Sequence, residues 1–277
     1  MNEWPIDENF IDYTAGNPMG GIINLPDQYP QLTVDVLETA DEQGGVENLS
    51  TGFHAIEFLL WGQRADQTDG PGDRPFTDYV DGGTAANQDR RRTYLKTVTE
   101  ILVADMKALT AAWDLGDRGS YGAKLMASPS HDGVTKILEG FSNMAISELY
   151  YERLSDPYRT QDHKDEESCF SESTYNDLVA NALGVENVYL GHYGALAGAS
   201  ISDLVRAKDS ALDGQMKDQL TAVRAAIAAI PQPFDHSVLA PADSDSNQKV
   251  KAAIDAFLPV QPTIDLVAKL LKVQINL

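Results

Sequence analysis

The sequence predicts an all-α protein made of two related helical bundles packed side by side, and three observations lead to this prediction. Apolar residues recur at helical spacing over most of the 277 residues. No segment shows the sustained alternation of apolar and polar residues that is typical of a strand. A weak repeat, Gly-Val followed by five residues and a second Gly, begins at Gly45, Gly133 and Gly184. The first two copies continue Gly-Phe, which indicates equivalent helices in two bundles.

Six segments combine helix-period apolar residues with Gly, Pro or Asp near their ends. They are 44–61, 87–113, 131–154, 172–198, 209–230 and 247–273. The two glycines of each repeat are about two helical turns apart and share a face, so we expect them where helices approach closely.

Two segments predict non-helical backbone. Residues 62–86 are rich in Gly, Asp, Pro and Thr, which indicates a long loop. Residues 1–42 contain four prolines and are expected to be extended or turn-like, with a short helix over 32–40.

The six predicted helices divide unequally between two domains. Residues 126–277 supply four, enough for a complete bundle, whereas residues 1–125 supply two clear ones. We therefore expect the first bundle to be incomplete at its N-terminus. The chain also opens without the basic start and apolar stretch of a signal peptide.

The composition argues against several classes of binding partner and site. The formal net charge of −21 argues against nucleic-acid phosphates and anionic membranes. The basic run Arg90-Arg91-Arg92 opens a predicted helix and is expected to be a solvated face. The single cysteine, Cys169, excludes an internal disulfide framework and is expected to be an inert, half-buried thiol. No apolar run is long enough to span a membrane.

His54 and Glu57 lie three residues apart in an otherwise apolar predicted helix. A buried carboxylate is costly without a partner, so Glu57 is expected to have a proton, a cation or a metal beside it. Both side chains can converge on one ion, as i, i+3 pairs do in di-iron bundles, although the order there is Glu-x-x-His. The alternative is a paired His and Glu within the core.

A zinc peptidase site is a further alternative. The His-Glu-x-x-His pattern requires a second histidine on the next turn, and the inverted pattern requires one directly after Glu57, where the residue is Phe58. An arrangement in which His54 and Glu57 share zinc with a distant histidine, His163 or His192, stays open.

Glu148 and Glu152 form a second candidate metal-binding pair. They lie one turn apart within the apolar stripe of the predicted helix 131–154. Two carboxylates so placed repel each other unless a cation or an arginine lies between them. A metal would meet this need, and so would an ion pair with Arg153.

A third candidate region precedes the next helix. Asp165, Glu166, Ser168 and Ser171 could bind a ligand, with the serine hydroxyls donating to an anion or orienting it. The alternative is that these residues only cap and begin a helix.

The sequence resembles the imelysin-like family, which includes iron-regulated envelope proteins and members once described as insulin-cleaving metallopeptidases. The motif G-x-H-x-x-E followed by F-L-L-W-G carries the resemblance, together with five landmarks in the family's order. They are R-P-F-T-D-Y (74–79), A-I-S-E-L-Y-Y-E-R-L (145–154), E-S-C-F-S (167–171), G-V-E-N-V-Y-L-G (184–191) and A-I-P-Q-P-F-D (229–235).

The resemblance implies a periplasmic or cell-envelope protein that binds iron, or an iron-bearing ligand, at the interface of two bundles. Such a protein would serve iron uptake, with envelope iron-transport components as partners. His54 and Glu57 would contribute from the first bundle, and Glu148 and Glu152 from the second. The alternatives are a zinc metallopeptidase, with zinc as its cofactor, and a structural partner protein that takes up no metal.

The chain departs from the family pattern at three places. Glu167 and Tyr175 stand where the family pattern has histidines, and Tyr150-Tyr151 replace Ala-Gly. The first two changes reduce the imidazoles available for a metal, and the third adds bulk beside Glu148 and Glu152.

Overall fold

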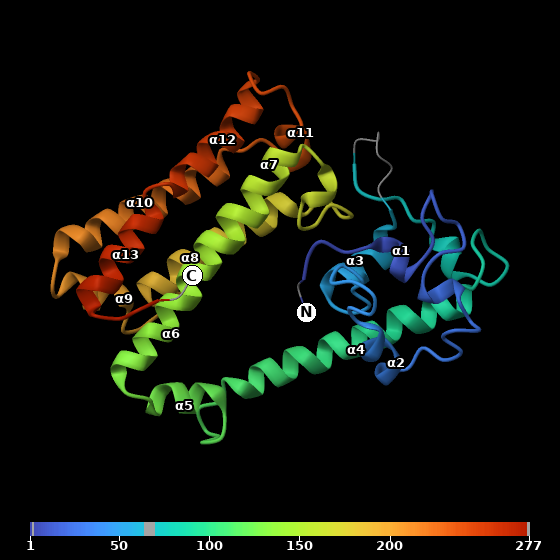
Figure 1. Ribbon diagram of the computed structural model, residues 1–277, viewed down its shortest axis with the longest axis horizontal. Helices are drawn as coiled ribbons and strands as arrows, with labels where there is room; N and C mark the ends of the chain where they lie inside the picture. Colours follow the sequence, from blue (N-terminus) through green and yellow to red (C-terminus); the bar gives the residue numbers. More distant parts are fainter. Residues whose placement is uncertain (2, 64–69, 276–277) are drawn as a thin grey trace. The chain divides into compact units, whose positions relative to one another are not determined.

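The protein is mostly helical: of the residues that the structure describes, 62% lie in helices and 2% in strands. The structure is a computed structural model and describes residues 1, 3–63 and 70–275 (Figure 1). Contacts divide it into two compact units, each with its own hydrophobic core. The first unit comprises residues 1–122 and 167–173, and the second comprises 123–166 and 174–277. The prediction of a helical protein is confirmed.

The first unit consists of short helices and turns packed around two longer helices. Its elements are α1 (Glu8–Ile11), η1 (Ile22–Asn24), α2 (Val34–Ala40), α3 (Phe53–Trp61), η2 (Phe76–Tyr79) and α4 (Gln88–Ala112). α5 (Tyr121–Ala127) crosses the boundary to the second unit. The core takes Phe58 and Leu59 from α3, Tyr94 and Val98 from α4, and Phe170 from the returning segment 167–173.

Helix α3 is shorter than the predicted helix 44–61. It begins at Phe53, directly after Gly52, whose φ of +96° is a left-handed conformation that favours glycine. It ends at Trp61, before Gly62 at φ +73°. The prediction was wrong for 44–52 because the apolar Val46 and Leu49 continue the helical spacing although the backbone there turns.

The second unit is a bundle of longer helices. Its elements are α6 (Ser130–Ser142), η3 (Asn143–Ser155), α7 (Asp156–Thr160), η4 (His163–Asp165), α8 (Thr174–Leu190), β1 (His192–Tyr193), β2 (Leu196–Ala197), α9 (Ile201–Arg206), α10 (Ser210–Ala228), α11 (Phe234–Val238), α12 (Asp245–Phe257) and α13 (Val260–Leu271). Helix α10 is central and contacts α8, α9, α12 and α13. It buries an apolar residue every three or four positions, namely Leu212, Met216, Leu220, Val223 and Ile227.

Three predicted helices of this unit differ in detail. The helix predicted for 247–273 is two helices, α12 and α13, separated at Leu258-Pro259. The helix predicted for 172–198 ends at Leu190, because Gly191 adopts φ +66° and opens an antiparallel hairpin, β1–β2. The helix predicted for 131–154 begins as α6 but continues as a π-helix, η3, which closes its turns with i→i+5 hydrogen bonds.

The repeated glycines do not mark close helix packing. A Cβ added at Gly140 or Gly184 would meet no atom within 4 Å. By contrast, Gly52 and Gly191 lie at helix ends with positive φ. The repeat therefore combines two kinds of glycine, those with open space around them and those with positive φ at helix ends.

Arg90 and Arg91 do not lie on the solvated face that the sequence suggested, whereas the Arg92 side chain is 41% exposed and pairs with Asp81. Arg91 is fully buried, and Arg90 donates to the backbone carbonyls of Ile23 (2.7 Å) and Tyr29 (2.7 Å). The run therefore ties the start of α4 to the preceding loops, because guanidinium groups can satisfy several carbonyls at once.

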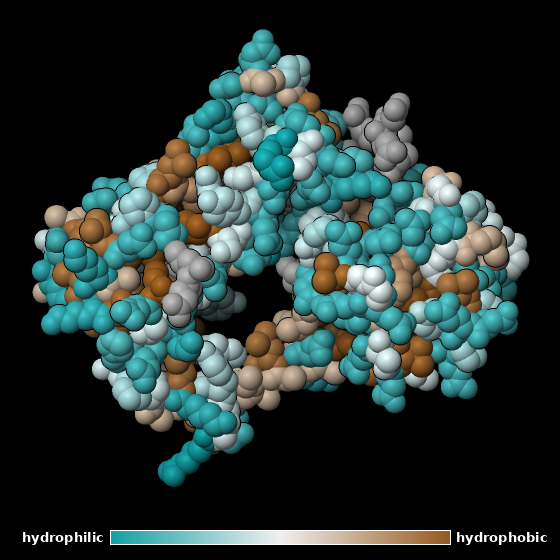
Figure 2. Space-filling view, viewed as in Figure 1, coloured by the Kyte–Doolittle hydropathy of each residue, from teal (hydrophilic) through white to brown (hydrophobic). Residues whose placement is uncertain are grey.

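Hydrophilic residues cover most of the surface visible in Figure 2, with separate hydrophobic patches between them. Among the residues that the structure describes, no helix is both long enough and apolar enough to cross a lipid bilayer.

Candidate functional site

Helix α3 presents His54 and Glu57 on adjacent turns, where they contact each other. The distance from His54 Nδ1 to Glu57 Oε2 is 2.9 Å. The other carboxylate oxygen, Oε1, accepts from the backbone N–H (2.8 Å) and the hydroxyl (2.6 Å) of Ser171. Glu57 therefore has the partners that its burial required, and they come from the protein itself.

A cluster of aromatic side chains begins beside this pair. The rings of Trp4 and His54 are 4.9 Å apart and meet edge to face. Phe170 packs against Trp4 at 5.6 Å and against Phe58 of α3 at 5.2 Å. His54 is 5% exposed, so its imidazole lies in a mostly apolar environment. Polar interactions there are stronger than in water, and unpaired polar atoms are costly.

One nitrogen of His54 remains unused. Because the Glu57 carboxylate only accepts, Nδ1 carries the proton of the contact and Nε2 is the open position. The Nε2 atom is buried and has no hydrogen-bond partner among the described residues. Histidines that bind metals commonly donate their other ring N–H to a carboxylate in this way. Both oxygens of Glu57 are thus engaged, one of them at His54 Nδ1, and Nε2 is the ring nitrogen left without a hydrogen bond in the described part of the chain.

Glu148 and Glu152 lie in η3 of the second unit and do not both face its core. Glu148 is half-buried and accepts from Arg153 Nη2 at 3.1 Å, and Glu152 is exposed. The expectation of two inward-facing carboxylates was wrong because it assumed α-helical periodicity. In a π-helix the turn is wider, and residues five apart, such as Glu148 and Arg153, come together.

The remaining predicted residues lie between 163 and 171. Asp165 ends η4 and is half-buried, whereas Glu166 and Ser168 are buried. Ser171 reaches the His54–Glu57 pair by donating to Glu57. Cys169 is 2% exposed, so it is fully buried rather than half-buried.

Within the described ranges, no three or more His, Cys, Asp or Glu side chains are grouped closely enough to hold a metal ion. His54 and Glu57 therefore do not belong to a preformed cluster of three such ligands among the described residues. The predicted metal-binding role of His54, Glu57, Glu148 and Glu152 stays a prediction.

Sequence reasoning missed a buried ion-pair network in the first unit. Asp12 accepts from Arg91 at 2.6 and 2.8 Å and from Arg74 Nη1 at 2.7 Å. Asp78 lies 3.5 Å from Arg74 and accepts from the Tyr13 hydroxyl at 2.5 Å. The four charged side chains are each at most 1% exposed, and two acids balance two bases. A signal was present in the sequence, since Arg74 and Asp78 belong to the R-P-F-T-D-Y landmark.

This network holds the C-terminal end of α3. The backbone N–H of Arg74 donates to the Trp61 carbonyl at 2.9 Å, and the Tyr79 hydroxyl donates to the Leu59 carbonyl. Burial raises the pKa of Tyr79 to about 12. Burial, followed by the hydrogen bond to Asp78, raises the pKa of Tyr13 to about 12. Both phenols are therefore kept protonated as donors.

The same loop also reaches the segment that carries Ser171. The backbone N–H of Gly72 donates to the Phe170 carbonyl at 2.8 Å. The loop thus contacts both parts of the His54 site, the helix α3 and residues 167–173.

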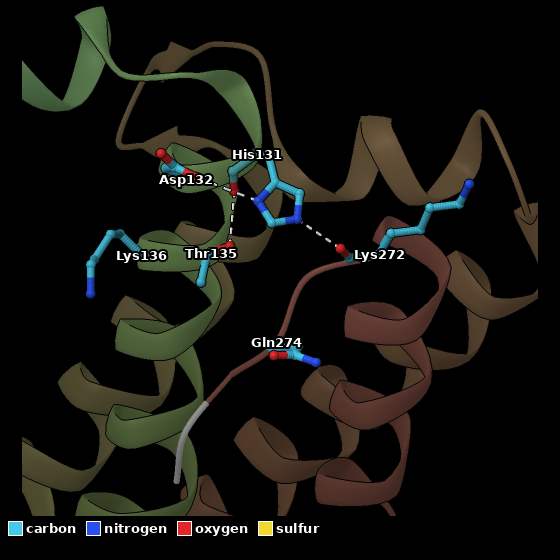
Figure 3. A pocket seen from close by; sticks show the side chains of 6 residues that line it. All are labelled: His131, Asp132, Thr135, Lys136, Lys272 and Gln274. Atoms are coloured by element: carbon cyan, nitrogen blue, oxygen red, sulfur yellow. Dashed lines mark hydrogen bonds and ion pairs between the residues drawn. The ribbon is translucent and has the colours of Figure 1, made fainter.

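A surface pocket of the second unit lies between the start of α6 and the end of α13 (Figure 3). Its histidine, His131, donates from Nε2 to the carbonyl of Lys272 at 2.7 Å, directly after α13. This contact satisfies a carbonyl at a helix C-terminus, which is a structural role.

A model of the imelysin family, peptidase M75, matches residues 1–258. The chain belongs to the imelysin family. An imelysin relative, the iron-regulated protein A of Synechococcus elongatus, is 24% identical over 251 residues. The match covers 87% of this chain but only 58% of the length of that relative.

The imelysin fold is also shared with a solved structure. An iron-regulated protein A precursor from Parabacteroides distasonis is 20% identical to this chain, with a TM-score of 0.69. The match covers 98% of this chain and 74% of that one. At this identity the similarity shows the fold, and the ligand has to be argued from the site.

Proposed function

We propose that this imelysin-family protein binds iron, or an iron-bearing ligand, at His54 and serves iron uptake in the periplasm or cell envelope. One observation carries the proposal: the buried, unpartnered Nε2 of His54, whose ring is fixed by Glu57 and Ser171. Imidazole nitrogen is a suitable iron ligand. The names of the relatives associate them with iron regulation, which favours iron over other metals.

Iron is the cargo of this proposal. It would meet one fixed nitrogen from the first unit, and its remaining positions would be filled by other ligands. Glu148 and Glu152 stay predicted contributors from the second unit. The proposal requires of Glu57 and Ser171 only that they hold the imidazole in one orientation and in one protonation state at Nδ1.

Calorimetric titration with Fe²⁺, ferric citrate and Zn²⁺ after chelation tests the proposal. The wild type is expected to bind at least one iron form, and His54→Ala is expected to lose that binding. His236→Ala is the matched control, because the His236 side chain is 44% exposed and lies in the second unit. Equal iron affinity in His54→Ala and the wild type would contradict the proposal.

The same samples test the zinc peptidase alternative. The proposal predicts that metal-loaded protein leaves unfolded insulin and casein intact. Zinc-dependent cleavage that disappears in Glu57→Gln would favour the peptidase instead, since such an enzyme needs a general base beside its metal-bound water.

A further inference from the structure

A second unpartnered nitrogen lies in the aromatic cluster that contains His54. The indole Nε1 of Trp4 is buried and has no hydrogen-bond partner among the described residues, as is the case for His54 Nε2. The two rings pack directly against each other, with centroids 4.9 Å apart and planes inclined by 64°. Phe170 also packs against Trp4, with ring centroids 5.6 Å apart and planes inclined by 70°.

The two nitrogens differ in what they can bind. An indole N–H is a donor and has no lone pair for a metal. Its hydrogen carries positive charge, so a bare cation beside it would be repelled. A buried donor is expected to be paired, and the group that pairs with it must be an acceptor.

We infer that the ligand held at His54 carries an oxygen that accepts a hydrogen bond from Trp4 Nε1. The site therefore takes iron with oxygen already attached, and His54 supplies the nitrogen while Trp4 recognises the oxygen. This inference rests on the proposed function and adds a specificity to it. The oxygen can belong to a chelator, such as a carboxylate, or to a water or hydroxide on the metal.

Substitution of Trp4 separates the N–H from the ring. Trp4→Phe keeps an aromatic ring against His54 and Phe170 but removes the donor. Trp113→Phe is the matched control, because Trp113 is 53% exposed and packs against Tyr121 rather than against this cluster. Titration calorimetry with ferric citrate and with Fe²⁺ alone measures both variants. Trp4→Phe is expected to bind the oxygen-bearing form about tenfold more weakly, as for the loss of one hydrogen bond to a charged group.

Nuclear magnetic resonance of the indole N–H groups gives an independent readout. Diamagnetic Ga³⁺ citrate and Zn²⁺ replace the iron forms. The Trp4 signal of the wild type, assigned by elimination with Trp61→Phe and Trp113→Phe, is expected to shift on binding. A shift with Ga³⁺ citrate alone identifies a chelator oxygen, and a shift with Zn²⁺ as well identifies an oxygen on the metal itself. Because this measurement uses wild-type protein, it holds even where Trp4→Phe does not fold.

The outcomes separate this inference from the proposed function. An unshifted Trp4 signal together with wild-type affinity in Trp4→Phe, while His54→Ala loses binding, overturns the inference and leaves the proposed function intact. The indole N–H would then face only the aromatic rings beside it. Wild-type affinity in His54→Ala overturns both.

Discussion

Arg91 and Asp12 form a two-point ion pair across 79 positions of sequence, with Nε donating to Oδ2 at 2.6 Å and Nη2 to Oδ1 at 2.8 Å. Both side chains are fully buried. Arg74 donates to the same carboxylate, so Asp12 joins the N-terminal segment, the loop after α3 and helix α4 at one point. Breaking a buried pair from one side leaves an uncompensated charge, which is strongly destabilising.

Arg91→Met is expected to lower the free energy of unfolding by about 3–5 kcal/mol, the usual loss when one member of a buried ion pair is removed. Urea unfolding measures the change. Arg92→Met is the control, because the Arg92 side chain is 41% exposed where it pairs with Asp81, and its loss is expected to cost about 1 kcal/mol or less. Equal losses of unfolding free energy in the two variants would show that the buried Arg91–Asp12 pair contributes no more to stability than an exposed pair.

Glu57→Gln is expected to destabilise the metal-free protein by about 1–3 kcal/mol. The amide that replaces the carboxylate turns one acceptor into a donor, which must then face either His54 Nδ1–H or the two donors of Ser171. Thermal or urea unfolding measures this loss. Glu100→Gln, in an exposed pair with Lys96, serves as the control and is expected to change stability by less than about 0.5 kcal/mol. A neutral Glu57→Gln would mean that the Ser171 contacts contribute nothing.

Phenols with raised pKa values, the half-buried Tyr13 and Tyr79 among them, make stability depend on alkaline pH. Tyr13 and Tyr79 have pKa values of about 12 in the folded protein, against an ordinary value of 10.0. Between these values the unfolded chain loses a proton that the folded chain keeps, so unfolding becomes more favourable as pH rises. The contribution is complete below pH 10 and is lost as the pH approaches 12. Absorbance titration of tyrosinate should show a late phase that includes these two phenols together with Tyr94 and Tyr189, whose pKa values burial also raises, and Tyr79→Phe should remove one group from it.

The glycines of one repeat provide a matched pair of substitutions. Gly184→Ala is expected to stabilise the protein by about 0.5–1 kcal/mol, because the position is inside α8 with open space around it. Gly191→Ala is expected to destabilise it, because Gly191 has φ +66° and a Cβ there would lie 2.9 Å from the Ala199 carbonyl oxygen. Melting temperatures measure both. Destabilisation by Gly184→Ala would contradict the open packing.

Glu148→Gln tests the predicted contribution of the second unit. Loss of the partly exposed ion pair with Arg153 is expected to cost less than about 1 kcal/mol of stability. If Glu148 also contributes to iron binding, Glu148→Gln is expected to bind iron at least about tenfold more weakly than the wild type. Unchanged affinity in calorimetry would leave Glu148 as an ion-pair partner of Arg153 alone.

Long helices were predictable because their apolar spacing persists over several turns. Helix α10 lies within two residues of its predicted bounds, and so does α4. Helix ends were less predictable where one glycine changes the backbone. Val46 and Leu49 keep helical spacing up to Gly52, but the helix begins only after it. The faces of η3 could not be predicted, because a π-turn depends on local packing that single-sequence periodicity does not encode.

Only the part of the candidate site that lies on one helix could be predicted from the sequence. His54 and Glu57 could be found because two polar residues on an apolar helical face need partners. Ser171 is 114 positions from Glu57, and the sequence contains no signal for that pairing beyond a hydroxyl in a polar segment. The unpartnered nitrogen of Trp4 depends on the way an N-terminal segment packs on α3, which is a tertiary contact without a local sequence signal.

The assignment of residues 167–173 to the first unit has a consequence for biosynthesis and for fragment design. The chain leaves that unit after residue 122, returns to it for seven residues, and leaves again after 173. During translation, α3 emerges long before the two Ser171 groups that satisfy Glu57. The first unit therefore completes its hydrogen bonding only after α6 and η3 have been synthesised. A gene fragment that stops at residue 122 would produce a helix α3 whose buried carboxylate has lost two of its three donors.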